Sequence, residues 1–194
     1  NRAALDTATY RRKIASALTL HRFGKDLVAH VSAVDCGIVQ CGFVTDFIAG
    51  DKVENDEQTR RFLGEVAETF AEAGLSVWQV NPRNPHAHTN IIRTPEGDNI
   101  IIDLESAVVT PIPAPGQWRS ALRRGKVPIF DDIDFERLRD YIAVNETDLE
   151  ESLGSERLAQ FKHDVEHGEE SIRAWQDSEP RIWGHLISGT YTLL

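Results

Sequence analysis

The sequence predicts an α+β protein in which strands and helices occupy separate parts of the chain. Short runs rich in Val, Ile and Phe occur before residue 50, and another pair surrounds a turn at 94–98. An apolar stripe at helical spacing lies between these regions, and helical patterns dominate after residue 116. Strands followed by a run of helices favour segregated elements over an alternating α/β fold.

The first fifty residues predict one helix and a pair of strands. Residues 5–23 have a helical pattern, and Gly24 follows as a stop signal. Residues 28–34 and 37–47 are rich in β-branched and aromatic side chains, which predicts two strands joined by a turn at 35–37.

A second helix is predicted to begin after Asn55 or Asp56, either of which can cap it. Its apolar stripe consists of Phe62, Leu63, Val66, Ala67 and Phe70. Gly74 ends the helix, and the alternation in residues 75–80 predicts a short strand.

The last third of the chain predicts a linker and then helices. Three prolines within residues 111–115 predict an extended linker, because proline interrupts helices and central strands. Helices are predicted at 117–124, 134–144 and 155–175, with a short one around 182–183. Gly168 interrupts the third of these at a cost of about 1 kcal/mol relative to Ala.

Composition excludes several classes of function. The net charge of -10 argues against a nucleic-acid partner and against an anionic membrane surface. No run is long and apolar enough for a membrane span. The first residues lack the pattern of a signal peptide, and two cysteines are too few for a disulfide framework. A cytoplasmic setting is therefore expected.

The most informative segment runs from Asn81 to Asp103. It consists of a polar loop, a strand that starts at Asn90, a turn at 94–98 and a strand that ends at Asp103. This hairpin is expected to bring an amide oxygen and a carboxylate to the same end. Two such hard oxygen ligands suit Mg²⁺, which takes one or two protein groups and completes its shell with substrate phosphates.

The segment resembles the catalytic loop and metal-binding hairpin of the protein-kinase-like superfamily, which includes aminoglycoside-kinase-like, choline-kinase-like and bacterial serine/threonine-kinase-like proteins. In that family the metal-binding Asp follows a catalytic-loop Asn by thirteen positions, as Asp103 follows Asn90. Residues 42–50 look like the hinge strand, and residues 57–73 look like the long helix that opens the C-lobe. The Asp-Leu-Glu at 103–105 stands in place of the family's Asp-Phe-Gly, as in small-molecule and atypical branches.

The resemblance implies a fold, two cofactors and a set of site residues. The fold would be kinase-like, with a partial N-lobe over residues 1–50 and a helical C-lobe over 51–194 that carries the metal-binding hairpin at 89–104. The cofactors would be ATP and Mg²⁺, and the acceptor a small-molecule or sugar hydroxyl. Asn90 and Asp103 would hold the metal, and the backbone of Asp46, Phe47 and Ile48 would face adenine.

The loop departs from the family at the catalytic base. The family's Asp lies five positions before the Asn, and that position is Pro85 here. An insertion would put Asn81 in the base's place, and an amide cannot act as a base. Alternatively His86 or His88 takes the proton, since imidazole titrates at about pH 6.5. Two interpretations stay open: a phosphotransferase, or a pseudokinase-type binding or regulatory module without efficient transfer.

The expected N-lobe is incomplete. No Gly-x-Gly precedes the hinge, and the two lysines there, Lys13 and Lys25, do not lie in a Val/Ile strand. The chain also contains no methionine. It is therefore expected to be either a fragment of a longer protein that starts before Asn1 or a degenerate member of the family. The acceptor and the oligomeric state are left open.

A different chemistry is also compatible with the loop. If His86 and His88 lay two apart on a strand, their imidazoles would share one side and could bind Zn²⁺ or Fe²⁺. With Asp103 as a third ligand, this arrangement would indicate a metal-dependent hydrolase or oxygenase.

Overall fold

The computed structural model describes residues 2–36, 39–104 and 132–178. Three predictions fall outside these residues, namely the linker at 111–115 and the helices at 117–124 and 182–183. Within the described parts the protein is mixed α and β, with long helices and three small antiparallel sheets. No helix in these parts is long and apolar enough to cross a membrane.

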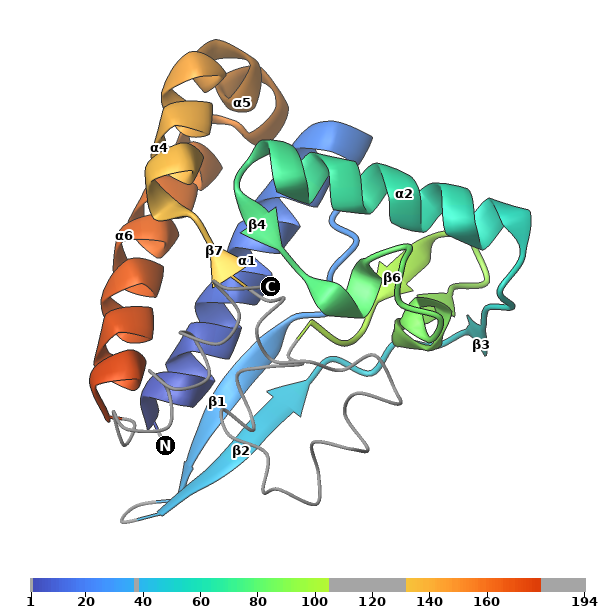
Figure 1. The fold of residues 1–194 in the computed structure, drawn as a ribbon, viewed down its shortest axis with the longest axis horizontal. Coiled ribbons are helices and arrows are strands. Elements are labelled where there is room, and N and C mark those ends of the chain that lie inside the picture. Colours follow the sequence, from blue (N-terminus) through green and yellow to red (C-terminus); the bar gives the residue numbers. More distant parts are fainter. Residues whose placement is uncertain (1, 37–38, 105–131, 179–194) are drawn as a thin grey trace, which may run out of the picture.

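The first half of the chain contains two long helices and most of the strands (Figure 1). The elements are α1 (Arg2–Phe23), β1 (Val31–Cys36), β2 (Val39–Thr45), β3 (Asp51–Lys52), α2 (Glu57–Glu72) and β4 (Leu75–Ser76). Two short 3-10 helices, η1 (Trp78–Val80) and η2 (Ala87–Asn90), precede a hairpin made of β5 (Ile91–Arg93) and β6 (Asn99–Ile101). The order β3-β5-β6 forms one sheet, and β1 pairs with β2 in another.

The C-terminal part is helical. After β7 (Asp132–Ile133), which pairs with β4, follow α4 (Phe135–Val144), α5 (Glu146–Leu153) and α6 (Ser155–Ser178). The helices predicted at 134–144 and 155–175 are thus confirmed. Helix α5 is not among the predicted helices; Asn145 separates it from α4, and it buries Leu149 and Leu153 against the core.

α1 and α6 run side by side in opposite directions (Figure 1). The amino group of Lys13 lies 3.2 Å from the carboxylate of Asp164, and near the other end of α1 the His21 ring bonds Ser152 at the end of α5. Gly168 explains how closely the helices approach, because a Cβ built there would lie 3.2 Å from Cβ of Tyr10. The glycine that weakens α6 as an isolated helix therefore permits its packing against α1.

One apolar cluster joins all of these elements. It contains side chains from α1, from α2, from the β5–β6 hairpin and from the C-terminal helices. Among them are Ile14, Leu18, Leu63, Phe70, Ile91, Ile101, Leu138 and Phe161. Each such side chain stabilises the fold by about 1.5–3 kcal/mol when fully buried. The hairpin is anchored in this core by Ile91 and Ile101, both 0 % exposed.

Three predictions about strands need correction. Residues 75–80 form a strand only at 75–76, because the chain then turns and the Trp78 carbonyl accepts hydrogen bonds from the Asn81 backbone and the Asn84 side chain. The first predicted strand begins later, at Val31. Asn90 does not start a strand: it is the last residue of η2, and β5 begins at Ile91.

Candidate functional site

The β5–β6 hairpin has the register that the candidate site requires. Ile91 pairs with Ile101, and Arg93 pairs with Asn99. The turn between the strands is closed by hydrogen bonds between Thr94 N–H and the Asp98 carbonyl at 2.8 Å and between Gly97 N–H and the Thr94 carbonyl at 2.9 Å. This turn lies at one end of the hairpin, so the residues before β5 and after β6 meet at the other end.

Asn90 and Asp103 meet at that open end. The Ile102 N–H donates to the Asn90 carbonyl at 2.9 Å, which continues the pairing of the hairpin by one step. Gln79, on η1, connects the two side chains: its Nε2 donates to Asp103 Oδ2 at 3.1 Å, and Asn90 Nδ2 donates to its Oε1 at 3.3 Å. The Asn90 amide and the Asp103 carboxylate are therefore hydrogen-bonded to the same side chain.

The hydrogen bonds also define how the Asn90 amide is turned. Its Nδ2 donates to the Gln79 backbone carbonyl at 2.8 Å as well as to the Gln79 side chain. The Asn90 nitrogen is thus directed toward Gln79. Asn90 is buried, at 7 % exposure, whereas Asp103 is half-buried. One amide oxygen and one carboxylate fit the donor set that Mg²⁺ takes from proteins.

The loop from Asn81 to Asn90 is a chain of closed turns. Asn81 Oδ1 accepts a hydrogen bond from Arg83 N–H at 2.9 Å, and Asn84 Oδ1 accepts one from His86 N–H at 3.0 Å. Thr89 donates its hydroxyl to the His86 carbonyl at 2.7 Å. Asn81, the residue expected in the place of the base, therefore uses its amide oxygen to hold the loop.

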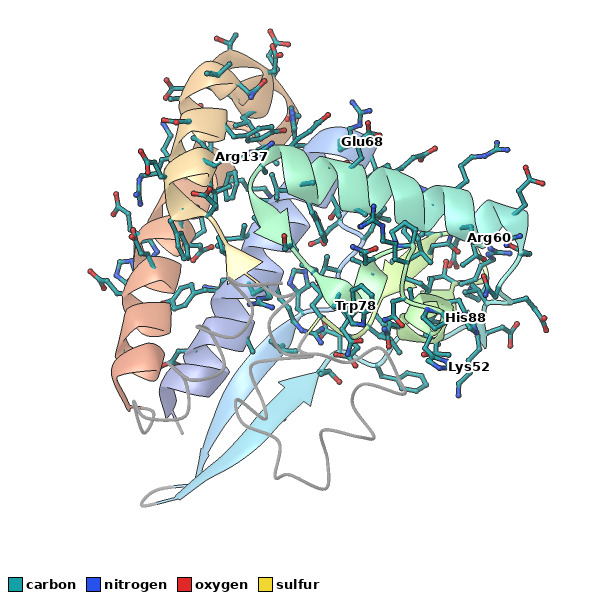
Figure 2. All side chains as sticks on the ribbon, viewed as in Figure 1. Lys52, Arg60, Glu68, Trp78, His88 and Arg137 are labelled. Atoms are coloured by element: carbon teal, nitrogen blue, oxygen red, sulfur yellow. The ribbon has the colours of Figure 1, made fainter. Side chains whose placement is uncertain are left out.

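The two loop histidines do not lie on a strand. His86 precedes η2 and is exposed, whereas His88 lies within η2 and is half-buried. The premise of the zinc or iron interpretation, two imidazoles on one side of a strand, is therefore wrong. Within the described residues, no group of three or more His, Cys, Asp or Glu side chains could hold a metal ion. Figure 2 shows His88 and Lys52 on the same side of the molecule, below α2.

The predicted hinge residues follow β2 directly. The Asp46 N–H donates to the His30 carbonyl at 3.1 Å, so this backbone donor is already engaged within the protein. Phe47 is 92 % exposed, and Ile48 is half-buried. The segment after β2 therefore presents a large apolar side chain to its surroundings.

Neither of the two lysines that precede the predicted hinge lies on a strand. Lys13 lies on α1 and pairs with Asp164, and Lys25 follows α1 and pairs with Asp98 at 2.6 Å. The Lys25 pair fastens the turn of the β5–β6 hairpin to the segment after α1. Both lysines are thus engaged in contacts that hold the fold.

Gln79 is a residue of the candidate site that the sequence pattern did not predict. The alternation in residues 75–80 predicts a strand, in which Gln79 would be one of its polar members. The side chain is instead 1 % exposed. A signal was present in the sequence, because Gln79 is a lone amide between Trp78 and Val80 in an apolar run, and a buried amide needs hydrogen-bond partners.

Comparisons with protein-family models, with curated proteins and with solved structures give no match to this chain.

Proposed function

We propose that the protein binds ATP with Mg²⁺ and transfers the γ-phosphate to a hydroxyl of a small molecule or sugar. The observation that supports this most is the linkage of Asn90 to Asp103 through Gln79 at the open end of the β5–β6 hairpin. The linkage ties an amide and a carboxylate to one buried side chain. In phosphoryl transfer, positioning and electrostatic stabilisation supply most of the catalysis, and residues that hold the metal ion contribute to both.

Each residue has a defined part in this proposal. Asn90 Oδ1 and the Asp103 carboxylate would hold the metal, which supplies charge neutralisation for the phosphates. The loop with Asn81, His86 and His88 precedes Asn90 and would face the acceptor hydroxyl. The exposed histidine His86 is free to approach a substrate, and a positioned imidazole contributes typically about 10²–10⁴-fold as a general base.

A second candidate is a kinase-like binding module without efficient transfer. Two observations favour it. The amide oxygen of Asn81 accepts a hydrogen bond from Arg83 N–H, and Pro85, which is exposed, has no side-chain group that could accept a proton. In this case ATP and Mg²⁺ would still bind. Binding and transfer must therefore be tested separately.

The test of binding is a thermal unfolding measurement with ATP and Mg²⁺. A ligand that binds only the folded protein stabilises it by about 2.7 kcal/mol at a hundred times its Kd, which raises Tm by several degrees. We expect this rise in the unaltered chain and its loss in Asp103→Ala. The matched control is Asp98→Ala, because Asp98 is an acid at the opposite end of the same hairpin and should leave the rise intact.

The controls separate the metal from the nucleotide. ATP with EDTA should give a smaller rise than ATP with Mg²⁺. No change in Tm of the unaltered chain at millimolar ATP and Mg²⁺ would exclude both candidates. Equal rises in Asp103→Ala and Asp98→Ala would leave nucleotide binding in place but remove the metal site from the hairpin.

A further inference from the structure

Arg12 of α1 is a buried cation that reaches the candidate site. The residue is 3 % exposed. Its Nη1 donates to the Ala29 carbonyl at 2.7 Å, and its Nη2 donates to the Ile102 carbonyl at 2.9 Å. One guanidinium therefore joins α1 to the residue immediately before Asp103.

The two carbonyls belong to segments that already run together. Ile101 N–H donates to the Leu27 carbonyl at 2.7 Å, and Ala29 N–H donates to the Ile101 carbonyl at 2.9 Å, so residues 27–29 extend the sheet beside β6. Arg12 continues this ladder at the point where β6 ends. A guanidinium has the fixed fork geometry to serve both carbonyls, whereas an ammonium is a single point of charge.

Ile102 is held on both sides of its own backbone. Its N–H donates to the Asn90 carbonyl, and its carbonyl accepts from Arg12. The orientation of this residue sets the direction in which the chain delivers Asp103. Burying a guanidinium costs free energy unless it is hydrogen-bonded, so the placement of Arg12 is informative. A residue needed only to fill space here could be apolar.

We propose that Arg12 is a positioning residue for Asp103, through which the place of α1 determines the geometry of the Asn90–Gln79–Asp103 group. Its neighbour Lys13 pairs with Asp164 of α6. The helix that carries Arg12 is therefore also held by the C-terminal helices. The positioning of Asp103 stands on the contacts alone. Only the consequence for metal affinity rests on the proposed function.

The test uses Arg12→Lys, which keeps the charge but reaches only one of the two carbonyls. The first readout is the NMR signal of the Gln79 side-chain amide, because Gln79 Nε2 donates to Asp103 and reports its position without any metal. The second is Mn²⁺ affinity. We expect Arg12→Lys to shift the Gln79 signals and to weaken Mn²⁺ binding about tenfold.

The matched control is Arg137→Lys. Arg137 of α4 also joins two elements through a carbonyl, donating from Nε to the Glu72 carbonyl at 3.2 Å, and lies away from the hairpin (Figure 2). Because Arg137 is exposed, Arg137→Lys is expected to change Tm little and to leave the Gln79 signals and the Mn²⁺ affinity unmoved. Because Arg12 is buried and Arg137 is exposed, the comparison is made on the Gln79 signals and not on the loss of Tm.

The outcomes are separable. Shifted Gln79 signals in Arg12→Lys, with no Mn²⁺ binding in the unaltered chain, would keep the positioning role and remove the proposed metal function. Unmoved Gln79 signals in folded Arg12→Lys would overturn the inference. Should Arg12→Lys fail to fold, the reciprocal measurement decides: Asp103→Asn must shift the Arg12 side-chain N–H signal, whereas Asp98→Asn must not, and equal responses would overturn the inference.

Discussion

Gln79 donates a hydrogen bond from Nε2 to the Asp103 carboxylate at 3.1 Å, although the two residues come from different elements. Gln79 lies on η1 and Asp103 follows β6, so the bond joins the start of the polar loop to the end of the hairpin. With Asn90 bonded to the same side chain, Gln79 is the centre of the candidate site.

Gln79→Leu tests this central place. The substitution keeps the approximate volume of a side chain that is 1 % exposed but removes its donor to Asp103 and its acceptor for Asn90. We expect a loss of about 1–3 kcal/mol in the free energy of unfolding, because a buried amide hydrogen is left with fewer acceptors. Urea unfolding measures this loss, and the Tm rise with ATP and Mg²⁺ should also fall.

Gln160→Leu is the matched control for that experiment. Gln160 is exposed and also donates to an aspartate, Asp164, at 2.9 Å. An exposed change of this kind is expected to alter stability by no more than about 0.5 kcal/mol. Equal losses in the free energy of unfolding would show that the buried hydrogen bonds of Gln79 add no more stability than the exposed ones of Gln160.

Gly50 and Gly97 form a second pair with contrasting expectations. Both have positive φ, at 156° and 91°. At Gly97 a Cβ would meet nothing within 4 Å, so Gly97→Ala should cost only the backbone strain of about 1–2 kcal/mol. At Gly50 a Cβ would lie 2.2 Å from the Arg93 carbonyl oxygen, which belongs to β5.

Gly50→Ala is therefore expected to destabilise more than Gly97→Ala, because the β3–β5 pairing must open to admit the methyl group. Urea unfolding of the two variants gives the comparison, and amide hydrogen exchange at Ile92 and Arg93 should be faster only in Gly50→Ala. Equal losses of stability would mean that the backbone around Gly50 yields without cost.

Local patterns in the sequence predicted α2 well. The Asp56 side chain caps the helix by accepting from Thr59 N–H at 2.7 Å, and Leu63, Val66 and Phe70 of the predicted stripe are buried. Gly74 follows the end of α2, as expected. The helix cap, the helical spacing of the apolar residues and the stop signal are all local features of the sequence. No information on tertiary contacts was therefore needed to predict this helix.

The turn after β4 could not be predicted in the same way. Alternation in residues 75–80 is compatible with a strand, but the chain turns at Trp78 because its carbonyl is used by Asn81 and Asn84 further along the loop. Such bonds are visible only once the loop is folded. The position of Asn90 and Asp103 at the open end of the hairpin was predictable from its two strands and its turn, whereas the hydrogen bonds of Gln79 depend on tertiary contacts.

His21 gives a prediction about pH. Burial lowers the pKa of His21, with Arg22 adding to the effect and Asp148 opposing it. A histidine whose pKa is lower in the folded protein binds its proton more readily in the unfolded chain. The contribution of His21 to the free energy of unfolding is therefore largest above its unfolded pKa of about 6.5. This contribution declines as the pH falls through that value toward the lower folded pKa.

His21→Gln should remove this contribution while keeping a partner for Ser152, which lies 2.7 Å from the His21 ring nitrogen. The measurement is Tm at pH 8 and at pH 5.5 for both proteins. We expect the unaltered chain to lose more Tm between these two values than the variant does. Identical losses would assign the acid sensitivity of the fold to other groups.

Asn81→Asp separates transfer from binding. An aspartate can still accept the hydrogen bond from Arg83 N–H that Asn81 accepts at 2.9 Å, so the loop should keep its shape. If position 81 faces the acceptor hydroxyl, the new carboxylate supplies a general base, which contributes typically about 10²–10⁴-fold to rate. ADP formation with choline, an aminoglycoside and glucose as acceptors measures the gain.

Asn84→Asp is the control for position within the loop. Asn84 is 3 % exposed and donates from Nδ2 to the Trp78 carbonyl at 3.1 Å, a bond that a carboxylate cannot make. This variant should lose stability and gain no transfer. A rise in ADP formation confined to Asn81→Asp, and abolished by adding Asp103→Ala, would assign the base position to residue 81. Binding of ATP and Mg²⁺ without any rise, with every acceptor, would instead favour the binding module, since the added carboxylate would then have no hydroxyl to activate.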